Sequence, residues 1–403
     1  MRTLTTPTRT QTRTTPASDA ALARAIEPVA VERFLADHWE QAPLHIARSE
    51  AGRFDDLLSA REAVRLMSEP GLRYPAFRLV KAGKRLDVRD YTENVPWRPE
   101  PISGTARVPR VLAEFEAGAT VVLQALHLSR MPLARYCRGL EARLEQPAQA
   151  NAYFTPRRSQ GLPVHHDTHE VFVLQVSGSK RWLVYEPVLE LPLRDQRYSA
   201  QLGGPGDPVL DVTLAPGDTL YLPRGWLHEA VTSETDSLHL TIGVNVYTWH
   251  DALTEALARA ATDIELRRSA PEDGEGGGEA LERLGGRLRP DAVANARRRR
   301  FLESRRPILD DQLAQLRGLD DLSPESEVER RLTVIADFDG RTLAFEGKRV
   351  SFPPQARAEI DALVAATQPI AVAHLPGRLD EAGRLVLVRR LVREGFLRVT
   401  SLT

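Results

Sequence analysis

Three side chains in the middle of the chain have the types and spacing of a metal-ligand set. His165 and Asp167 stand two residues apart in the run PVHHDTHEVFVLQVSGSKRW (163–182), and His228 follows in APGDTLYLPRGWLHEAV (215–231). Two imidazoles and one carboxylate in an H-x-D…H arrangement are the set that holds Fe(II) in non-haem oxygenases. Such a set leaves three positions on the metal open, enough for a bidentate keto acid and O₂. The pattern therefore predicts oxidative chemistry at iron.

The ligands lie in a part of the chain with a β pattern. Between residues 151 and 249, short candidate strands alternate with turns that contain Gly and Pro, which is typical of a sandwich or barrel. Because residues two apart on a strand point to the same side, His165 and Asp167 can share one metal while His166 faces away. His228 then arrives from another strand. We expect an α+β chain built around a double-stranded β-helix of the jelly-roll type.

A cation follows the turn after the first ligand pair. A cosubstrate dicarboxylate needs one fixed cation for its far carboxylate, because a buried charge without a partner is costly. Lys180 and Arg181 compete for that role. Strand alternation puts Lys180 on the face of Trp182 and Arg181 on the face of Leu183, and both faces carry apolar residues. Alternation leaves the choice open, and Lys180 is inward only if the Trp182 face lines the barrel.

Several other polar residues admit two interpretations. We expect His166 and His169 to be solvated rather than to contact a substrate. His239 and Thr241 share one side of the strand SLHLTIG and could line the barrel mouth. For His239, a structural role with a hydrogen bond to the backbone is an equal alternative. The four arginines of 297–300 spread around a helix, so a solvated face is favoured over a nucleic-acid surface.

The composition limits the class of protein. The 403 residues carry a net charge of −1 from 54 basic and 55 acidic side chains, so nothing in the overall charge attracts nucleic acid or an anionic membrane. Cys137 is the only cysteine, which excludes an intrachain disulfide framework and a multi-cysteine zinc site. No apolar run approaches the roughly 20 residues that span a bilayer. We expect a soluble, cytoplasmic protein with no membrane partner.

The patterning divides the chain into successive parts. The opening segment is rich in Thr and Arg and lacks apolar periodicity, which predicts a disordered tail over residues 1–19. Helical spacing predicts an entry helix over 20–37, kinked at Pro28. After the β region, an acidic and glycine-rich stretch at 271–278 is expected to be a linker, followed by charged helices over 281–319. Residues 332–403 show a hairpin, two helices joined by a turn, and a strand, which is typical of a winged-helix unit.

Two runs resemble the core of the JmjC-type ribosomal oxygenases, which belong to the cupin superfamily. They are NAYFTPRRSQGLPVHHDTHEVFVLQVSGSKRW at 151–182 and PGDTLYLPRGWLHEAV…SLHLTIG at 216–243. The resemblance is specific over about 151–246 and looser from about Phe34 to the end of the chain. It implies Fe(II) as metal, with 2-oxoglutarate and O₂ as cosubstrates. The implied reaction is hydroxylation of a protein side chain, arginine or histidine, in a ribosomal protein.

The same resemblance implies a domain plan and a set of site residues. The plan is a JmjC domain over 20–250, a helical dimerisation region over 251–331 and a winged-helix-like domain over 332–403, hence a homodimer. By position, it assigns the metal to His165, Asp167 and His228, and the far carboxylate of 2-oxoglutarate to Lys180. Positions near the cosubstrate and substrate match Asn151, Tyr153 and Thr241. The chain departs from the family pattern at His166, at His169 and in the 271–278 insertion, which puts the identity of the substrate in doubt.

Two other functions remain open. The same chemistry could act on a peptide natural product or a small molecule. Alternatively, the jelly roll could sense a ligand for a DNA-binding regulator that uses the 332–403 unit. That unit carries ten basic and eight acidic residues, too even a balance for a surface that follows phosphates. We therefore expect no nucleic-acid partner.

Overall fold

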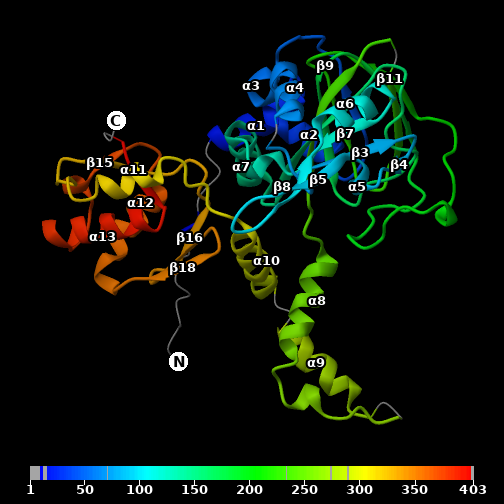
Figure 1. Ribbon diagram of the computed structural model, residues 1–403. Helices are drawn as coiled ribbons and strands as arrows, with labels where there is room; N and C mark the ends of the chain where they lie inside the picture. The colour runs from blue at the N-terminus through cyan, green and yellow to red at the C-terminus, as the bar shows by residue number, and fades with distance from the viewer. Residues whose placement is uncertain are drawn as a thin grey trace. The chain divides into compact units, whose positions relative to one another are not determined.

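The computed structural model describes residues 10–11, 16–69, 71–232, 234–272, 275–287 and 290–400 (Figure 1). The chain forms two compact units. One comprises residues 16–246, and the other comprises residues 247–403 together with the N-terminal segment. No helix among the described residues is both long enough and apolar enough to cross a membrane.

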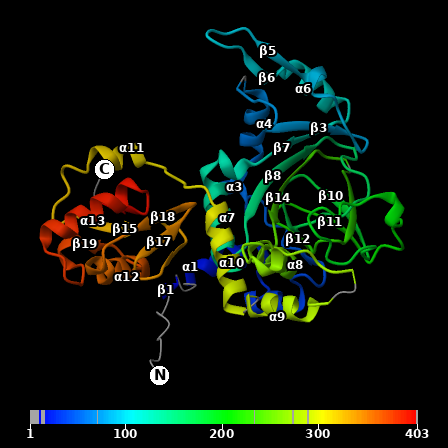
Figure 2. The ribbon, with the colours of Figure 1, turned by 90° about the horizontal axis from the view of Figure 1, so that it is seen from below.

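Two facing sheets make up the core of the first unit. Their strands are β2 Leu44–Ile46, β3 Phe77–Lys81, β4 Lys84–Arg85, β7 Thr120–Leu123, β8 Ala148–Thr155, β9 Glu170–Ser177, β10 Lys180–Tyr185, β11 Leu210–Leu214, β12 Thr219–Leu222, β13 Leu227–Thr232 and β14 Ser237–Val244. The major sheet has the order β2-β12-β9-β14-β8-β7-β3-β4 and the minor sheet β11-β10-β13. Figure 2 looks into the barrel, with β8 and β14 on one side and β10 and β11 on the other. This confirms the predicted α+β class and jelly-roll barrel.

The central strands of the major sheet are covered on both faces, which explains their nearly continuous apolar sequence. On β9, Val171 and Val173 face the minor sheet, where they pack with Trp182 and neighbouring apolar side chains. Phe172 and Leu174 face the other way, into a core shared with the helices. Alternation along a strand therefore divides the unit into an inner cluster between the sheets and an outer one beneath the helices.

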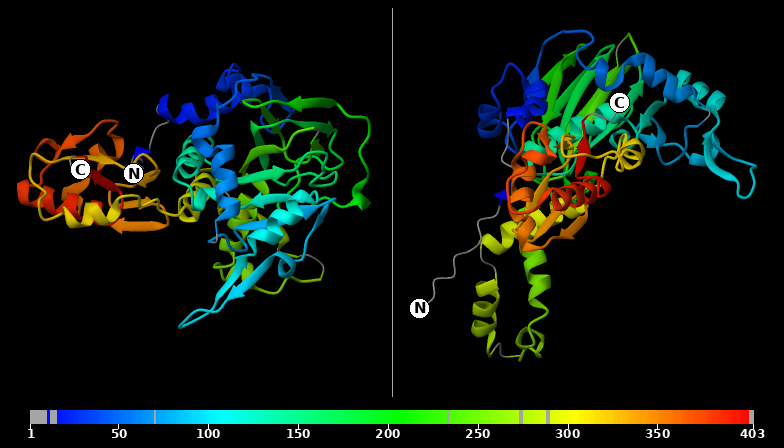
Figure 3. Two further views of the ribbon diagram at one scale, coloured as in Figure 1. Left: turned by 45° about the horizontal axis from the view of Figure 1, so that its top comes forward. Right: turned by 90° about the vertical axis from the view of Figure 1, so that its left-hand side faces the viewer.

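Helices and a hairpin cover the outside of the barrel. The helices are α1 Pro16–Ile26, α2 Val31–Asp37, α3 Asp55–Leu58, α4 Ala60–Ser68, α5 Val88–Tyr91, α6 Val108–Glu116 and α7 Met131–Leu144. The hairpin consists of β5 Thr92–Val95 and β6 Ile102–Ala106 and projects away from the barrel (Figure 3).

The disordered tail predicted over residues 1–19 is wrong where the structure describes it, because Thr10–Gln11 form the short strand β1 and residues 16–19 are helical. Residues 16–19 of the predicted tail form the first turn of α1, where the missing N–H of Pro16 costs no hydrogen bond. The helix expected over 20–37 with a kink at Pro28 forms as two helices, α1 and α2, and Pro28 lies in the break between them. Residues 1–9 and 12–15 of the predicted tail lie outside the described residues.

The second unit contains two small sheets and six α-helices among its described residues. Its strands are β1 Thr10–Gln11, β15 Glu327–Arg330, β16 Ala336–Phe338, β17 Thr342–Phe345, β18 Lys348–Ser351, β19 Ile370–Ala371 and β20 Leu397–Val399. They form sheets of order β1-β16-β17-β18 and β19-β15-β20. The helices are α8 Trp249–Ala260, α9 Gly277–Arg287, α10 Pro290–Ser304, α11 Gln312–Arg317, α12 Arg357–Ala365 and α13 Glu381–Arg393. The predicted hairpin is confirmed as β17 and β18, and the two C-terminal helices as α12 and α13.

Two predictions in this unit need correction. Helix α9 begins at Gly277, so the last two residues of the predicted 271–278 linker are helical. The arginine run is not uniformly solvated, because Arg298 is buried and its guanidinium pairs with Asp337 of β16 at 3.1 Å. Four consecutive residues spread around a helix, so one of them must face the sheet on which α10 packs.

Candidate metal centre

A cavity between the two sheets brings most of the predicted site residues together. Its walls include His165, Asp167, His228, Lys180, Tyr153 and Thr241. Asn151 is not among the lining residues. Its side-chain oxygen instead accepts a hydrogen bond from the backbone N–H of Ala125 at 2.9 Å. Asn151 therefore links β8 to the backbone at Ala125 and does not form part of the cavity wall.

Backbone hydrogen bonds join the two segments that carry the metal-ligand candidates. The N–H of His165 donates to the carbonyl of His228 at 3.1 Å, and the N–H of His228 donates back at 2.8 Å. The strand alternation used to align His165 with Asp167 does not apply, because these residues are not in a strand. Residues 156–169 run as a loop with isolated bridges, since Pro163 can donate no ladder hydrogen bond, and β9 begins at Glu170. His165 and Asp167 nevertheless reach the same site.

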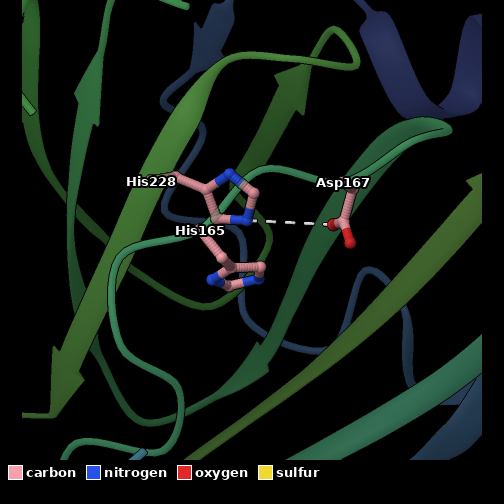
Figure 4. A group of neighbouring side chains, drawn as sticks. All are labelled: His165, Asp167 and His228. Carbon is pink, nitrogen blue, oxygen red and sulfur yellow. Dashed lines mark ion pairs between the residues drawn. The ribbon is translucent and has the colours of Figure 1, made fainter. Parts of the chain in front are cut away.

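The three candidate ligands converge (Figure 4). One potential ligand atom from each of His165, Asp167 and His228 lies within 4.8 Å of the other two, and His228 Nε2 is 3.8 Å from Asp167 Oδ2. His165 Nδ1 is 2.8 Å from the carbonyl oxygen of Pro163, and His228 Nδ1 is 3.0 Å from that of Trp226. A carbonyl only accepts, so each Nδ1 carries the proton and each Nε2 keeps its lone pair. Both rings are therefore set to coordinate a cation through Nε2.

The protonation states also suit a divalent metal. Burial lowers the pKa of His228 to about 4, with the nearby His165 adding to the effect, so the ring is neutral at pH 7. Burial by itself would raise the pKa of the Asp167 carboxyl, but the fields of His169 and His165 outweigh it and the pKa lies below its ordinary value. Neutral imidazole and ionised carboxylate are the forms that ligate. The donor set therefore fits a metal such as Fe(II).

The other two histidines of the HHDTH run differ from each other. His166 faces away from the ligands, as predicted, but it is only 5% exposed, so the prediction that it is solvated is wrong. Its Nε2 lies 3.0 Å from the carbonyl of Gln196, in a loop that covers it. His169 packs on β14 at Gly243, where an added Cβ would lie 2.5 Å from the ring. His169 thus stays close enough to act on the charge of Asp167.

The structure resolves the choice between the two candidate cations. Trp182 lines the cavity, and Lys180 shares its face, is buried, and donates from Nζ to Thr155 Oγ1 at 3.1 Å. Arg181 points to solvent and pairs with Asp211 at 2.6 Å. Burial lowers the pKa of Lys180 to about 7, because no carboxylate of the described residues offsets the loss of hydration. An anionic group in the cavity would supply that missing partner.

The sequence did not point to Thr155, and it left the role of His239 open. Thr155 does not line the cavity but accepts the hydrogen bond from Lys180, and strand alternation from Tyr153 would have put it on the same side. His239 lines the cavity, stacks on Tyr153 with ring centres 5.1 Å apart and meets the edge of Trp182. Burial, helped by the charge of Lys180, lowers the pKa of His239 well below its ordinary value. It is therefore a neutral aromatic wall.

The ligand assignment predicts that Asp167→Ala or His228→Ala removes tight divalent-metal binding. We expect an affinity loss of more than about 100-fold, since even the loss of a group that supports a ligand costs 10–100-fold. The measurement is a Co(II) titration followed by visible absorption. His166→Ala, which changes a neighbouring histidine that faces away, should keep the wild-type affinity. Unchanged binding by Asp167→Ala would refute the assignment.

Comparisons with known proteins show what the part of the chain that carries this site is similar to. Residues 127–252 match the JmjC domain family. The histidyl-hydroxylase and lysine-specific demethylase NO66 of Drosophila persimilis is 32% identical over 259 residues, which cover 62% of this chain and 36% of that protein. Ribosomal oxygenase 1 of Gallus gallus is 32% identical, with 62% and 41% covered. Ribosomal oxygenase 2 of Rattus norvegicus is also 32% identical, with 61% and 53% covered.

Solved structures agree on the fold. The X-ray structure of Escherichia coli YcfD has a TM-score of 0.57 at 17% identity and covers 92% of this chain and 98% of that one. A second YcfD structure, in complex with cobalt and 2-oxoglutarate, has a TM-score of 0.55 at 18% identity, with 93% and 99% covered. The curated relatives are longer, and the chain spans from about a third to about half of their length. The His-Asp-His cluster thus lies in the segment that matches the JmjC domain, and the chain is similar to the ribosomal oxygenases, as the sequence resemblance predicted.

Proposed function

We propose that the protein is an Fe(II)- and 2-oxoglutarate-dependent dioxygenase that hydroxylates a protein side chain. The observation that carries the proposal is one cavity that holds both a convergent His-Asp-His cluster and a buried, carboxylate-free lysine. The cluster fits a metal with open positions, and Lys180 fits the far carboxylate of a dicarboxylate. A cavity with both features suits a keto-dicarboxylic acid that bridges them.

The names of the relatives support a substrate class. NO66 is named a histidyl-hydroxylase, two further relatives are named ribosomal oxygenases, and a YcfD structure was determined with cobalt and 2-oxoglutarate. We propose a ribosomal protein as the substrate and an arginine or histidine side chain as the target. The proposed reaction would then take place in the cytoplasm, where ribosomal proteins are synthesised.

Different residues of this chain would bind the metal and orient the cosubstrate. His165, Asp167 and His228 would hold the metal, and the hydrogen bonds from His165 and His228 Nδ1 to backbone carbonyls keep both rings in the ligating tautomer. When bound, Fe(II) and 2-oxoglutarate supply the oxidative decarboxylation of the keto acid by O₂, which yields succinate, CO₂ and a hydroxylated substrate carbon. Lys180 Nζ would orient the cosubstrate from the other end of the cavity.

The cavity walls would protect the reaction. Val171, Val173 and Trp182 present apolar surface between the ligand cluster and the core of the barrel. The stacked rings of Tyr153 and His239 form a further wall. Exclusion of water prevents unproductive side reactions and strengthens the pairing of Lys180 with a carboxylate.

Incubation of the full chain with Fe(II), 2-oxoglutarate and dissociated ribosomal proteins tests the proposal. We expect a mass gain of one oxygen atom on one ribosomal protein, located by tandem mass spectrometry, together with an equal amount of succinate. Formation of succinate without any modified ribosomal protein would favour a peptide natural product or a small molecule as substrate. No turnover with any of these substrates would contradict the proposal.

The role of Lys180 predicts a sharp contrast between neighbours. Lys180→Met should weaken 2-oxoglutarate binding by at least about 100-fold, since leaving a buried charge without its partner costs about 3–5 kcal/mol. Arg181→Met is the matched control: it removes an exposed, ion-paired cation from the next position of β10 and should leave affinity unchanged. The measurement is isothermal titration calorimetry under anaerobic conditions. Equal affinities for Lys180→Met and wild type would reject Lys180 as the anchor.

The buried cation also predicts a stability effect in the absence of cosubstrate. The pKa of Lys180 is about 7 in the folded chain and about 10.4 in an unfolded one. The unfolded state therefore binds more protons between these values, and the cost of the buried charge is fully present below pH 7 and disappears as the pH rises. We expect Lys180→Met to be more stable than wild type at pH 6, by at least about 1 kcal/mol in urea unfolding, and to lose this advantage towards pH 10. A less stable variant at pH 6 would contradict the argument.

We also propose that the helical region after the barrel forms a homodimer contact. On α8, Trp249, Leu253 and Leu257 follow helical spacing and are all exposed, by 75%, 46% and 56%. Contiguous apolar surface of this kind marks interaction sites, and a second copy of this chain is the partner that the family resemblance implies.

This surface predicts the outcome of a charge substitution. Leu253→Glu combined with Leu257→Glu should convert a dimer to a monomer in sedimentation velocity, because buried carboxylates without partners are costly. Leu281→Glu, on the exposed face of α9, serves as the single-site comparison. A variant that remains fully dimeric would exclude this face.

For residues 332–403 we propose a winged-helix-like domain that has no nucleic-acid partner. Three arginines of α13 are engaged by the protein itself. Arg384 donates to the carbonyl of Ala373, Arg389 to that of Leu319, and Arg390 pairs with Glu394. These contacts support the view that the helix is not a phosphate-tracking surface. Salt-dependent binding to random duplex DNA would overturn it.

A further inference from the structure

A buried polar cluster lies next to the ligand-bearing segments but outside the cavity lining. Its centre is the carboxylate of Glu170, which is fully buried. Glu170 Oε1 accepts from the guanidinium of Arg224 at 2.9 Å, and Oε2 accepts from the hydroxyl of Tyr221. The backbone N–H of Glu40 donates to that hydroxyl at 3.0 Å, and the Glu40 carboxylate also pairs with Arg224. Four polar groups thus contact one another around one fully buried carboxylate.

The cluster connects both segments that carry metal-ligand candidates. Glu170 is the first residue of β9 and follows Asp167 by three positions. Arg224 lies in the turn between β12 and β13, four positions before His228. An ion pair between Glu170 and Arg224 therefore ties the end of the Asp167 loop to the turn that leads to His228.

A backbone hydrogen bond joins the turn that contains Arg224 directly to Asp167. The N–H of Gly225, the residue after Arg224, donates to the carbonyl of Asp167 at 3.0 Å. Gly225 has a φ of +92°, and an added Cβ would lie 2.5 Å from the carbonyl oxygen of Leu189. The turn is therefore fixed in a conformation that only glycine adopts freely, with its N–H aimed at Asp167.

Asp167 has special need of such support. His228 is held in the ladder of β13 and β10, whereas Asp167 lies in a loop without strand pairing of its own. A ligand on a loop keeps its geometry only if neighbouring groups hold it, and the loss of such support typically costs metal affinity. The carboxylate of Glu170 is the one charged group of the cluster that both Arg224 and Tyr221 bind.

We propose that Glu170 is a positioning residue for the metal centre. Through Arg224 and the Gly225 turn, its carboxylate holds Asp167 in place relative to His228. The inference rests on the proposed metal site and deepens it, because it names a group that sets metal affinity without touching the metal. Tyr221 donates a further hydrogen bond to Glu170, and Glu40 pairs with Arg224.

The test compares Glu170→Gln with a matched control in the full chain. Glu141→Gln changes another buried carboxylate of the same unit, which pairs with Arg138 and accepts from the N–H of Ala148 but does not line the cavity. Both variants should lose thermal stability. Only Glu170→Gln should weaken Co(II) binding, by about 10–100-fold, and change the visible spectrum of the bound Co(II). Wild-type Co(II) affinity in a destabilised Glu170→Gln variant would show that the cluster serves the fold alone.

Tyr221→Phe provides a milder variant in case Glu170→Gln does not fold. It removes one hydrogen bond from Glu170 and leaves the ion pair with Arg224 intact, so a smaller loss of Co(II) affinity is expected, with the same change in spectrum. Affinity and spectrum equal to wild type would contradict the proposal. Wild-type protein that binds no Co(II) would instead refute the metal site itself, which separates failure of the proposed function from failure of this inference.

Discussion

The pair of backbone hydrogen bonds between His165 and His228 is the contact on which the site depends. It joins a loop that crosses between the sheets to a strand of the minor sheet. The bridge fixes the two rings beside each other, and Asp167 is then brought within reach by the short chain that follows. Each ring is also oriented by a backbone carbonyl two residues earlier in the chain. Main-chain hydrogen bonds thus position most of the ligand set. Once the barrel has folded, little further conformational entropy is lost in fixing these side chains.

On the opposite wall of the cavity, the main constraint is the high free energy of burying the charge of Lys180. Lys180 is held by a single hydroxyl among the contacts described for it, and its neighbours Trp182 and His239 offer no negative charge. Such a position weakens the free protein but gives selectivity, because only an anion of the right length relieves the cost. In the proposed function, the two ends of the cavity would select a ligand by its charge and by the distance between its binding groups.

Much of this arrangement could be predicted from the sequence. The residue types and spacing of His165, Asp167 and His228 identified the cluster, and turn signals identified the barrel. Strand alternation does not hold for the first two ligands, because residues 156–169 form a loop, yet both side chains reach the same site as expected. Alternation could not choose between Lys180 and Arg181, since both faces of β10 carry apolar residues. The pairing of Glu170 with Arg224 spans 54 positions and depends on strand order, so no local pattern could reveal it.

An anaerobic titration of the wild-type chain with Fe(II) and 2-oxoglutarate tests the central claim most directly. Chelation of the keto acid by iron on the His165, Asp167 and His228 cluster produces a weak visible metal-to-ligand charge-transfer band. We expect this band to saturate at one equivalent of each component in wild-type protein and to be absent from the His228→Ala variant. A folded wild-type protein that shows no band, or a His228→Ala variant that shows the same band, would contradict the account.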